Sequence, residues 1–204
     1  MSPNNLLRAA RVSHLELANG TTIALDVERW LGPPTTEECE VLERVIPPVL
    51  DVGCGPGRHV LACAERGIIA LGLDAAAPAI EIALARGAPV LQRSIFASVP
   101  GAGRWCSALL LDGNIGIGGD PEALLTRVRA LLQSGGGLFV EVEAPGTPSY
   151  TAAAQIVTDG NRSEWFPWAI VGSDSLPHVA RAAGFRPLTK WEGQGRWFAA
   201  LQAN

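Results

Sequence analysis

The sequence predicts a doubly wound α/β fold, in which helices cover both faces of a mostly parallel sheet. Along the middle of the chain, apolar runs of about four to six residues alternate with helical segments of about ten residues. Such uniformly apolar strands are typical of a sheet that is buried on both faces. The chain has 204 residues, 48% hydrophobic and 18% charged, which suits one globular domain with a sizeable core.

A β-hairpin and a helix are predicted before this alternation. Residues 12–27 alternate between apolar and polar types around Asn19-Gly20, and an Asn-Gly pair tolerates the positive φ values of a tight hairpin turn. Thr35 and Glu38 then have the spacing of a capping box. We therefore expect a helix over residues 36–45.

The central elements follow from apolar runs and their breakers. The segment after Asp120 should start a helix, because Asp is a good N-cap and Pro121 suits the first helical position. The expected strands are 49–52, 68–73, 90–93, 108–111 and 138–143, and the expected helices are 58–66, 78–86 and 121–132.

The pattern changes after residue 146. A second hairpin is expected over 151–158 and 164–171, with its turn at residues 159–161. Ser173 or Asp174 should then cap a helix that ends at Ala183. Residues 186–191 and 196–201 complete the chain as an expected antiparallel pair.

The turn after the first central strand is the strongest functional signal. Asp51 ends the strand, and Gly53, Gly55 and Gly57 follow with the spacing GxGxG. Glycines permit a sharp turn and a close approach of a ligand, and the helix that starts near Arg58 can present free N–H groups there. A dinucleotide-binding loop is expected to read GxGxxG instead.

The run VLDVGCGPGRHVLACAERG resembles the first motif of class I S-adenosylmethionine-dependent methyltransferases. The resemblance extends over about residues 49–146, and it implies a seven-stranded sheet with an antiparallel last strand. It also implies S-adenosylmethionine as the cofactor, bound over the ends of the first strands. The region after residue 111 resembles, more loosely, actinobacterial methyltransferases without an assigned substrate.

The resemblance places the cofactor on the ends of successive strands. The loop residues expected to contact it are Asp51, Gly53, Cys54, Gly55 and Gly57. Asp74 ends the second strand and can accept two hydrogen bonds from ribose hydroxyls, or it can instead cap the following helix. Ala75, Ser94 and Ile95 are expected beside the adenine, although many family members carry an acid where Ser94 stands.

The loop after the fourth strand is expected beside the transferred methyl group. Asp112 and Gly113 begin it, and they are expected to contact the cofactor. A general base is needed only if the acceptor atom carries a proton at neutral pH. Asp112 and Glu143 are the catalytic candidates, and His14 is a further candidate base. His59 can pack or face solvent, and His178 is expected at the surface.

Aromatic and basic side chains are the candidates for acceptor binding. The chain has six tryptophans and one tyrosine. Trp30, Trp165 and Trp168 either belong to the core or form a wall of the acceptor pocket. Arg29 and Arg162 can hold a carboxylate or phosphate of the acceptor, or they can form exposed ion pairs.

Composition argues against several other classes. The net charge is −4 without a basic block, which argues against nucleic acid as a partner. No CxxC pair occurs among Cys39, Cys54, Cys63 and Cys106, so we expect no metal site. Residues 1–20 lack the apolar core of a signal peptide, and no stretch is apolar enough to span a bilayer. We therefore expect a cytoplasmic protein without a membrane partner.

The leading hypothesis is a methyltransferase that acts on a small molecule. We expect a hairpin and helix in residues 1–46, a cofactor-binding core in 47–146 and a substrate-side segment in 147–204, all within one domain. The arginine-rich, alanine-rich composition suggests a GC-rich bacterial source. A non-catalytic cofactor-binding module and a nicotinamide-dependent oxidoreductase remain alternatives, and the sequence does not indicate the oligomeric state.

Overall fold

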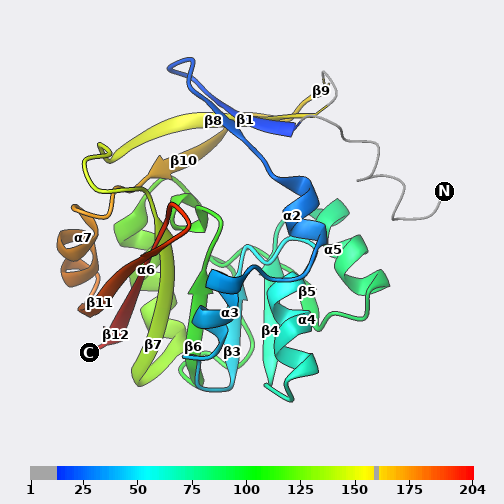
Figure 1. Cartoon of the computed structure of the whole chain (residues 1–204), viewed down its shortest axis with the longest axis vertical. Coiled ribbons are helices and arrows are strands. Elements are labelled where there is room, and N and C mark those ends of the chain that lie inside the picture. The colour runs from blue at the N-terminus through cyan, green and yellow to red at the C-terminus, as the bar shows by residue number, and fades with distance from the viewer. Residues whose placement is uncertain (1–12, 159–160) are drawn as a thin grey trace.

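A computed structural model describes residues 13–158 and 161–204, and its main sheet confirms the predicted doubly wound fold. The seven strands lie in the order β11-β12-β7-β6-β3-β4-β5 (Figure 1). They are β3 (Val49–Val52), β4 (Ala70–Asp74), β5 (Val90–Gln92), β6 (Trp105–Leu110), β7 (Leu132–Val142), β11 (Phe185–Gly193) and β12 (Arg196–Ala203). The last strand, β12, is antiparallel to both of its neighbours, as the resemblance implied.

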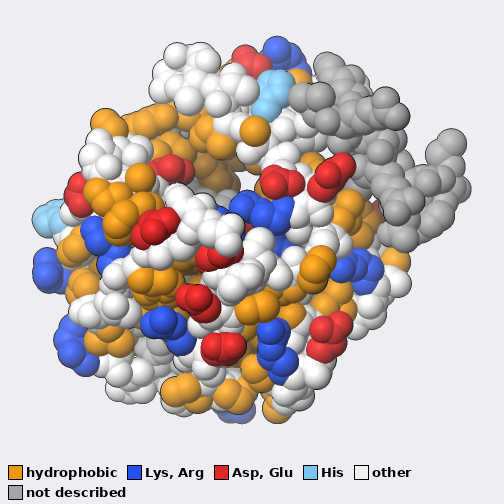
Figure 2. Space-filling model, in the orientation of Figure 1, with side chains coloured by type: hydrophobic (Ala, Val, Ile, Leu, Met, Phe, Trp, Pro, Cys, Tyr) orange, Lys and Arg blue, Asp and Glu red, His pale blue; other side chains and the backbone are white. Residues whose placement is uncertain are grey.

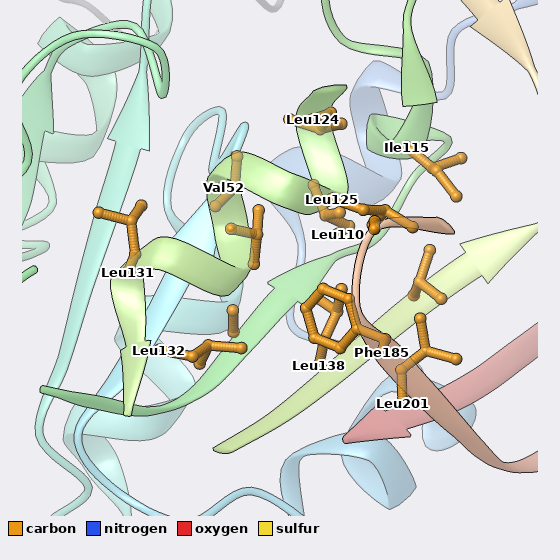
Figure 3. Packing of buried hydrophobic residues seen from close by; sticks show 14 of the residues in the cluster. Val52, Leu110, Ile115, Leu124, Leu125, Leu131, Leu132, Leu138, Phe185 and Leu201 are labelled. Carbon is orange, nitrogen blue, oxygen red and sulfur yellow. The ribbon is translucent and has the colours of Figure 1, made fainter. Parts of the chain in front are cut away.

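Helices cover both faces of the main sheet because successive strand residues point to opposite sides. Leu110 packs with α6 (Pro121–Leu131) and α7 (Leu176–Ala182), whereas Leu109 packs with α3 (Thr36–Leu42) and α4 (Arg58–Glu65). Figure 3 shows the first of these clusters, where leucines of α6 meet Leu138 and Leu201 of the sheet. The helix α5 (Ala77–Ala85) packs beside α4.

A second sheet, which we call the lid sheet, lies across one end of the main sheet (Figure 1). Its order is β10-β8-β1-β2, and β9 pairs with β8. The strands are β1 (Ser13–Leu17), β2 (Thr22–Ala24), β8 (Tyr150–Thr158), β9 (Asn161–Arg162) and β10 (Phe166–Ile170). Both predicted hairpins are therefore present, and β1 joins them by pairing with β8. That pairing was not predicted.

Two local predictions need correction, and part of two others lies outside the described residues. A short helix, α2 (Val27–Leu31), follows β2, where no helix was predicted; Asp26 caps it. The N-cap position of α7 is Ser175 rather than Ser173 or Asp174, and the Ser175 side chain makes no capping hydrogen bond; Pro177 lies in the first helical turn, where its missing N–H costs nothing. Residue 12 of the first hairpin and residues 159–160 of the second turn are not described.

The predicted capping box on α3 is present. Thr35 Oγ1 accepts from the Glu38 N–H, and a Glu38 carboxylate oxygen accepts from the Thr35 N–H. Within residues 13–158 and 161–204, no helix has the length and apolar character that a membrane span requires.

Candidate functional site

The glycine loop joins β3 to α4 and has three glycines with positive φ: Gly53 at 74°, Gly55 at 52° and Gly57 at 83°. Its amides are used within the fold. Gly53 and Cys54 donate to the Leu73 carbonyl, and Gly57 donates to the Cys54 carbonyl. These N–H groups therefore already donate to acceptors within the fold. A Cβ on Gly55 would meet nothing within 4 Å, so the loop leaves open space there.

Asp74 holds the loop from the end of β4. Its two carboxylate oxygens accept from the Gly55 N–H at 2.8 Å and from the Ala76 N–H at 2.8 Å. Burial raises the pKa of Asp74, against the lowering effect of these amide bonds, and the nearby Asp51 raises it as well. Each oxygen keeps a lone pair for a ligand hydroxyl, and Ala75 beside it is exposed.

Asp51 and Cys54 point into the protein. Asp51 is 1% exposed, and its Oδ2 lies 3.6 Å from Nδ1 of the buried His59. The Cys54 thiol packs on Gly72, where a Cβ would come within 2.6 Å of its Sγ. Burial raises the pKa of Cys54, and the charges of Asp51 and Asp74 add to this effect. Any contact of Cys54 with a ligand must therefore involve its backbone.

The segment after β5 differs from the prediction in which side chain is accessible. Ser94 Oγ accepts a hydrogen bond from the Phe96 N–H at 3.3 Å. Ile95 is 3% exposed and belongs to the main core, so its side chain is not available to an adenine. Phe96, which was not predicted, is 48% exposed and packs on Gly118.

A cavity of about 280 Å³ lies between the lid sheet and the main sheet. Figure 2 shows a hollow beneath the lid sheet with basic side chains at its centre. Its lining includes Asp26, Arg29, Trp30, Asp112, Gly113, Glu141, Glu143, Trp168 and Arg196. Asn114 lies between the lining residues Gly113 and Ile115 and connects this wall to the glycine loop, because its Nδ2 donates to the carbonyls of Val52 and Gly53 at 3.0 and 2.9 Å.

An arginine–carboxylate network supports one wall of the cavity; we define it as Arg29, Arg58, Arg196, Glu38, Asp112 and Glu141. Arg58 donates to both oxygens of Glu38 at 3.0 and 2.6 Å. Arg196 binds Glu141 with two hydrogen bonds, at 2.8 and 2.6 Å, and also contacts Glu38 at 2.7 Å. Glu38 is fully buried, so these paired charges satisfy one another where water cannot.

Asp112 is the member of this network predicted to be catalytic. Its carboxylate lies 3.0 Å from Arg29, 2.7 Å from Arg58 and 3.4 Å from Arg196. Its φ of 56° is unusual for a residue other than glycine, and its N–H donates to Glu141 at 2.7 Å. With three guanidinium groups on its oxygens, this carboxylate is poorly placed to take a proton from an acceptor.

Charge coupling extends from the network to His59. Burial lowers the pKa of His59, but the carboxylates of Asp51 and Glu38 outweigh it and raise the pKa to about 9. Burial raises the pKa of Glu38, yet hydrogen bonds from His59 and Arg58 bring it well below its usual range. Glu38, His59 and Asp112 come close enough to share a metal ion, but the Arg58 guanidinium already binds both carboxylates.

Glu143 follows β7 directly and lines the cavity. Its backbone is fixed, because its N–H donates to Val171 and its carbonyl accepts from Ser173, both at 2.9 Å. Within residues 13–158 and 161–204, its carboxylate has no hydrogen bond or ion pair. Burial raises the pKa of Glu143, and the negative charge of Glu141 raises it further.

The remaining candidates divide between the cavity and the surface. Trp30 and Trp168 line the cavity, whereas Trp165 is 50% exposed and does not. His14 alternates on β1 with the cavity-lining Leu15 and therefore faces the other side of the lid sheet. His178 is exposed on α7, as expected.

The two arginine candidates form ion pairs. Arg162 pairs with Glu16 at 2.7 Å on the exposed side of the lid sheet, and Arg29 pairs with Asp112. The prediction missed Arg58, Arg196, Glu141 and Phe96. The only local signal for Arg58 was a charged residue in an otherwise apolar segment directly after the glycine loop.

The comparison with solved structures identifies the fold. No protein-family model and no curated protein matches the chain. Among solved structures, a methyltransferase from Bacteroides fragilis that depends on S-adenosylmethionine, in complex with S-adenosylhomocysteine, superimposes with a TM-score of 0.81. It is 19% identical, and the match covers 100% of this chain and 93% of that one.

Two further solved structures are described as methyltransferases of small molecules. The amino pentose methyltransferase CalS10 of Micromonospora echinaspora, bound to S-adenosylmethionine, has a TM-score of 0.64 at 18% identity, over 87% of this chain and 94% of its own. The 1,6-didemethyltoxoflavin-N1-methyltransferase of Burkholderia thailandensis has a TM-score of 0.57 at 20% identity, over 76% of this chain and 70% of its own. The chain therefore has the fold of S-adenosylmethionine-dependent methyltransferases.

Proposed function

We propose that this protein transfers a methyl group from S-adenosylmethionine to a small-molecule acceptor. The observation that carries the proposal is the position of the cavity: Asp112 and Gly113 line it, and the next residue, Asn114, donates to the glycine-loop carbonyl of Gly53. The resemblance of the loop to methyltransferase motif I and the fold shared with methyltransferases support it. When bound, S-adenosylmethionine supplies an electrophilic methyl group on a sulfonium.

The residues present fit this cofactor. Asp74 can accept hydrogen bonds from the ribose hydroxyls, and the open space at Gly55 admits a ligand close to the backbone. The carbonyls of Val52, Gly53 and Cys54 each accept one hydrogen bond within the fold and keep a second lone pair that can receive the methionine ammonium. We assign the adenine contact to the exposed Phe96 ring with Ala75 and the Ser94 backbone, since base–aromatic stacking tolerates the missing acid.

The two terminal segments of the chain form the lid sheet, on the side of the cavity that we assign to the acceptor. We assign cofactor binding to residues 47–146 and acceptor binding to the lid sheet, which residues 1–46 and 147–204 supply. A cavity of about 280 Å³ suits a small metabolite. CalS10 and the sugar N-methyltransferase KedS8 support an acceptor of this size.

The proposal is tested by calorimetric titration with S-adenosylhomocysteine and, separately, with NAD. We expect the former to bind, and Asp74→Ala to weaken its binding by about 1–3 kcal/mol through the unpaired ribose hydroxyls. Phe96→Ala should cost about 1–3 kcal/mol through lost stacking. Asp120→Ala is the matched control, because Asp120 also accepts from a backbone N–H, at the start of α6, away from the loop. Binding of NAD alone would overturn the proposal.

A further inference from the structure

The positive charges of the cavity wall are already neutralised by the protein. Arg29 pairs with Asp112 at 3.0 Å, and Arg196 holds Glu141 through two hydrogen bonds. Arg196 donates from Nε, Nη1 and Nη2 to Glu141 and Glu38. Arg29 donates from Nη2 to Asp112, so an anion bound to the remaining donors of Arg29 would lie beside the Asp112 carboxylate. The alternative in which Arg29 holds an anionic acceptor is therefore disfavoured.

The negative charges of the wall are in excess. Asp26 and Glu143 line the cavity in addition to the paired Asp112 and Glu141, and neither forms an ion pair within the described part of the chain. Asp26 Oδ1 caps α2 by accepting from the Arg29 N–H. Glu143 is held rigidly by its backbone bonds to Val171 and Ser173. The wall thus offers two carboxylates without a cation of their own.

Aromatic rings complete an environment suited to a cation. Trp30 and Trp168 both line the cavity, and the face of a tryptophan attracts an ammonium group. The Trp30 Nε1–H and the Arg29 Nε–H are buried without a hydrogen-bond partner in the described structure. Because solvent does not reach these two atoms, the suitability of the wall for a cation depends on the tryptophan rings and the carboxylates.

We propose that the acceptor is a small amine and that Glu143 binds its ammonium group. The proposal rests on the methyltransferase function and specifies its substrate class. Glu143 takes one proton from the ammonium, which frees the nitrogen lone pair. The nitrogen then forms a bond to the methyl carbon as the carbon–sulfur bond breaks and its electron pair stays on the neutral thioether. The methylated ammonium leaves, and the proton on Glu143 passes to water.

The test is a binding comparison of matched probes on the full chain saturated with S-adenosylhomocysteine. The two sets are glucosamine, glucose and glucuronate, and benzylamine, benzyl alcohol and benzoate. We expect the amine of at least one set to bind about tenfold more tightly than its alcohol and its acid. A preference for the alcohol or acid, or no binding by any probe, overturns the proposal.

The role of Glu143 is tested with Glu143→Gln, which keeps the size of the side chain and removes its charge. The preference for the amine over the alcohol should fall to about twofold or less, whereas Glu40→Gln, on the exposed side of α3, should keep it. A preference that survives Glu143→Gln shows that Glu143 is not the ammonium site. Failure of S-adenosylhomocysteine to bind would instead contradict the methyltransferase function itself.

Discussion

Raising the pH should weaken the fold through His59, the buried histidine between Glu38 and Asp51. Its Nε2 lies 3.3 Å from Glu38 and its Nδ1 lies 3.6 Å from Asp51. Because the folded state raises its pKa from 6.5 to about 9, the protonated imidazole stabilises the folded chain. This contribution is complete below pH 6.5 and is lost as the pH rises through about 9.

The size of the effect follows from the same two values. At about 1.36 kcal/mol for each pH unit, the interval from 6.5 to about 9 corresponds to about 3 kcal/mol in the free energy of unfolding. His59→Asn removes the titrating group and keeps a polar side chain. The free-energy difference between wild type and this variant should therefore shrink by about 3 kcal/mol between about pH 6 and about pH 9.5.

Urea unfolding across this pH range measures that difference directly. His178→Asn, which changes an exposed histidine on α7, should keep the wild-type pH dependence. Proton NMR of the three histidines provides a second measurement, with the His59 signal assigned by its absence from His59→Asn. A difference that stays constant with pH, or that grows as the pH rises, would refute a protonated His59 in the folded state.

Two further substitutions test the arginine–carboxylate network and the packing of the lid sheet on the main domain. Arg196→Leu leaves Glu38 and Glu141 without their shared cation and should lower the free energy of unfolding by about 3–5 kcal/mol. The control Arg162→Leu, which breaks an exposed ion pair, should lower it by under about 1 kcal/mol. Equal losses of the two variants in urea unfolding would contradict this. Gly116→Ala places a Cβ 2.3 Å from a carbonyl oxygen of β10 and 2.7 Å from the Trp168 ring. Gly116→Ala should lower the free energy of unfolding by about 1–3 kcal/mol and speed hydrogen exchange in β10. Gly137→Ala, where the added Cβ has its nearest neighbour at 3.6 Å, should do neither. Unchanged exchange in Gly116→Ala would show that β10 does not pack closely on Gly116.

The sequence predicted those elements whose signals are local. An apolar run between breakers identified β3 with its observed bounds, and the capping box at Thr35 located the start of α3. The helix α2 was missed because its five residues are too few to show a 3.6-residue period. Ile95 was expected to be accessible to the adenine but is buried, and no role was predicted for the exposed Phe96. Both residues lie beyond the end of β5, where strand alternation no longer applies.

The network could not be predicted, because its pairs join distant parts of the sequence. Arg58 meets Glu38 from 20 positions away, and Arg196 meets Glu38 from 158 positions away. No periodicity or motif relates these residues. The joining of the two hairpins through β1 and β8 has the same origin, because each hairpin satisfies its own turn chemistry and neither specifies the partner of its free edge.

The network also connects the two halves of the proposed site. Arg58 is the first residue of α4, directly after the glycine loop, and its Nη2 lies 2.7 Å from Oδ2 of Asp112, which lines the cavity. Buried ion pairs contribute little net stability compared with apolar side chains of the same volume, so stability alone does not account for the network. Directional bonds fix positions in a way that apolar packing does not. We therefore infer that these pairs hold Asp112 at its positive φ and set the cavity wall in a fixed position relative to the glycine loop, where an in-line methyl transfer depends on alignment.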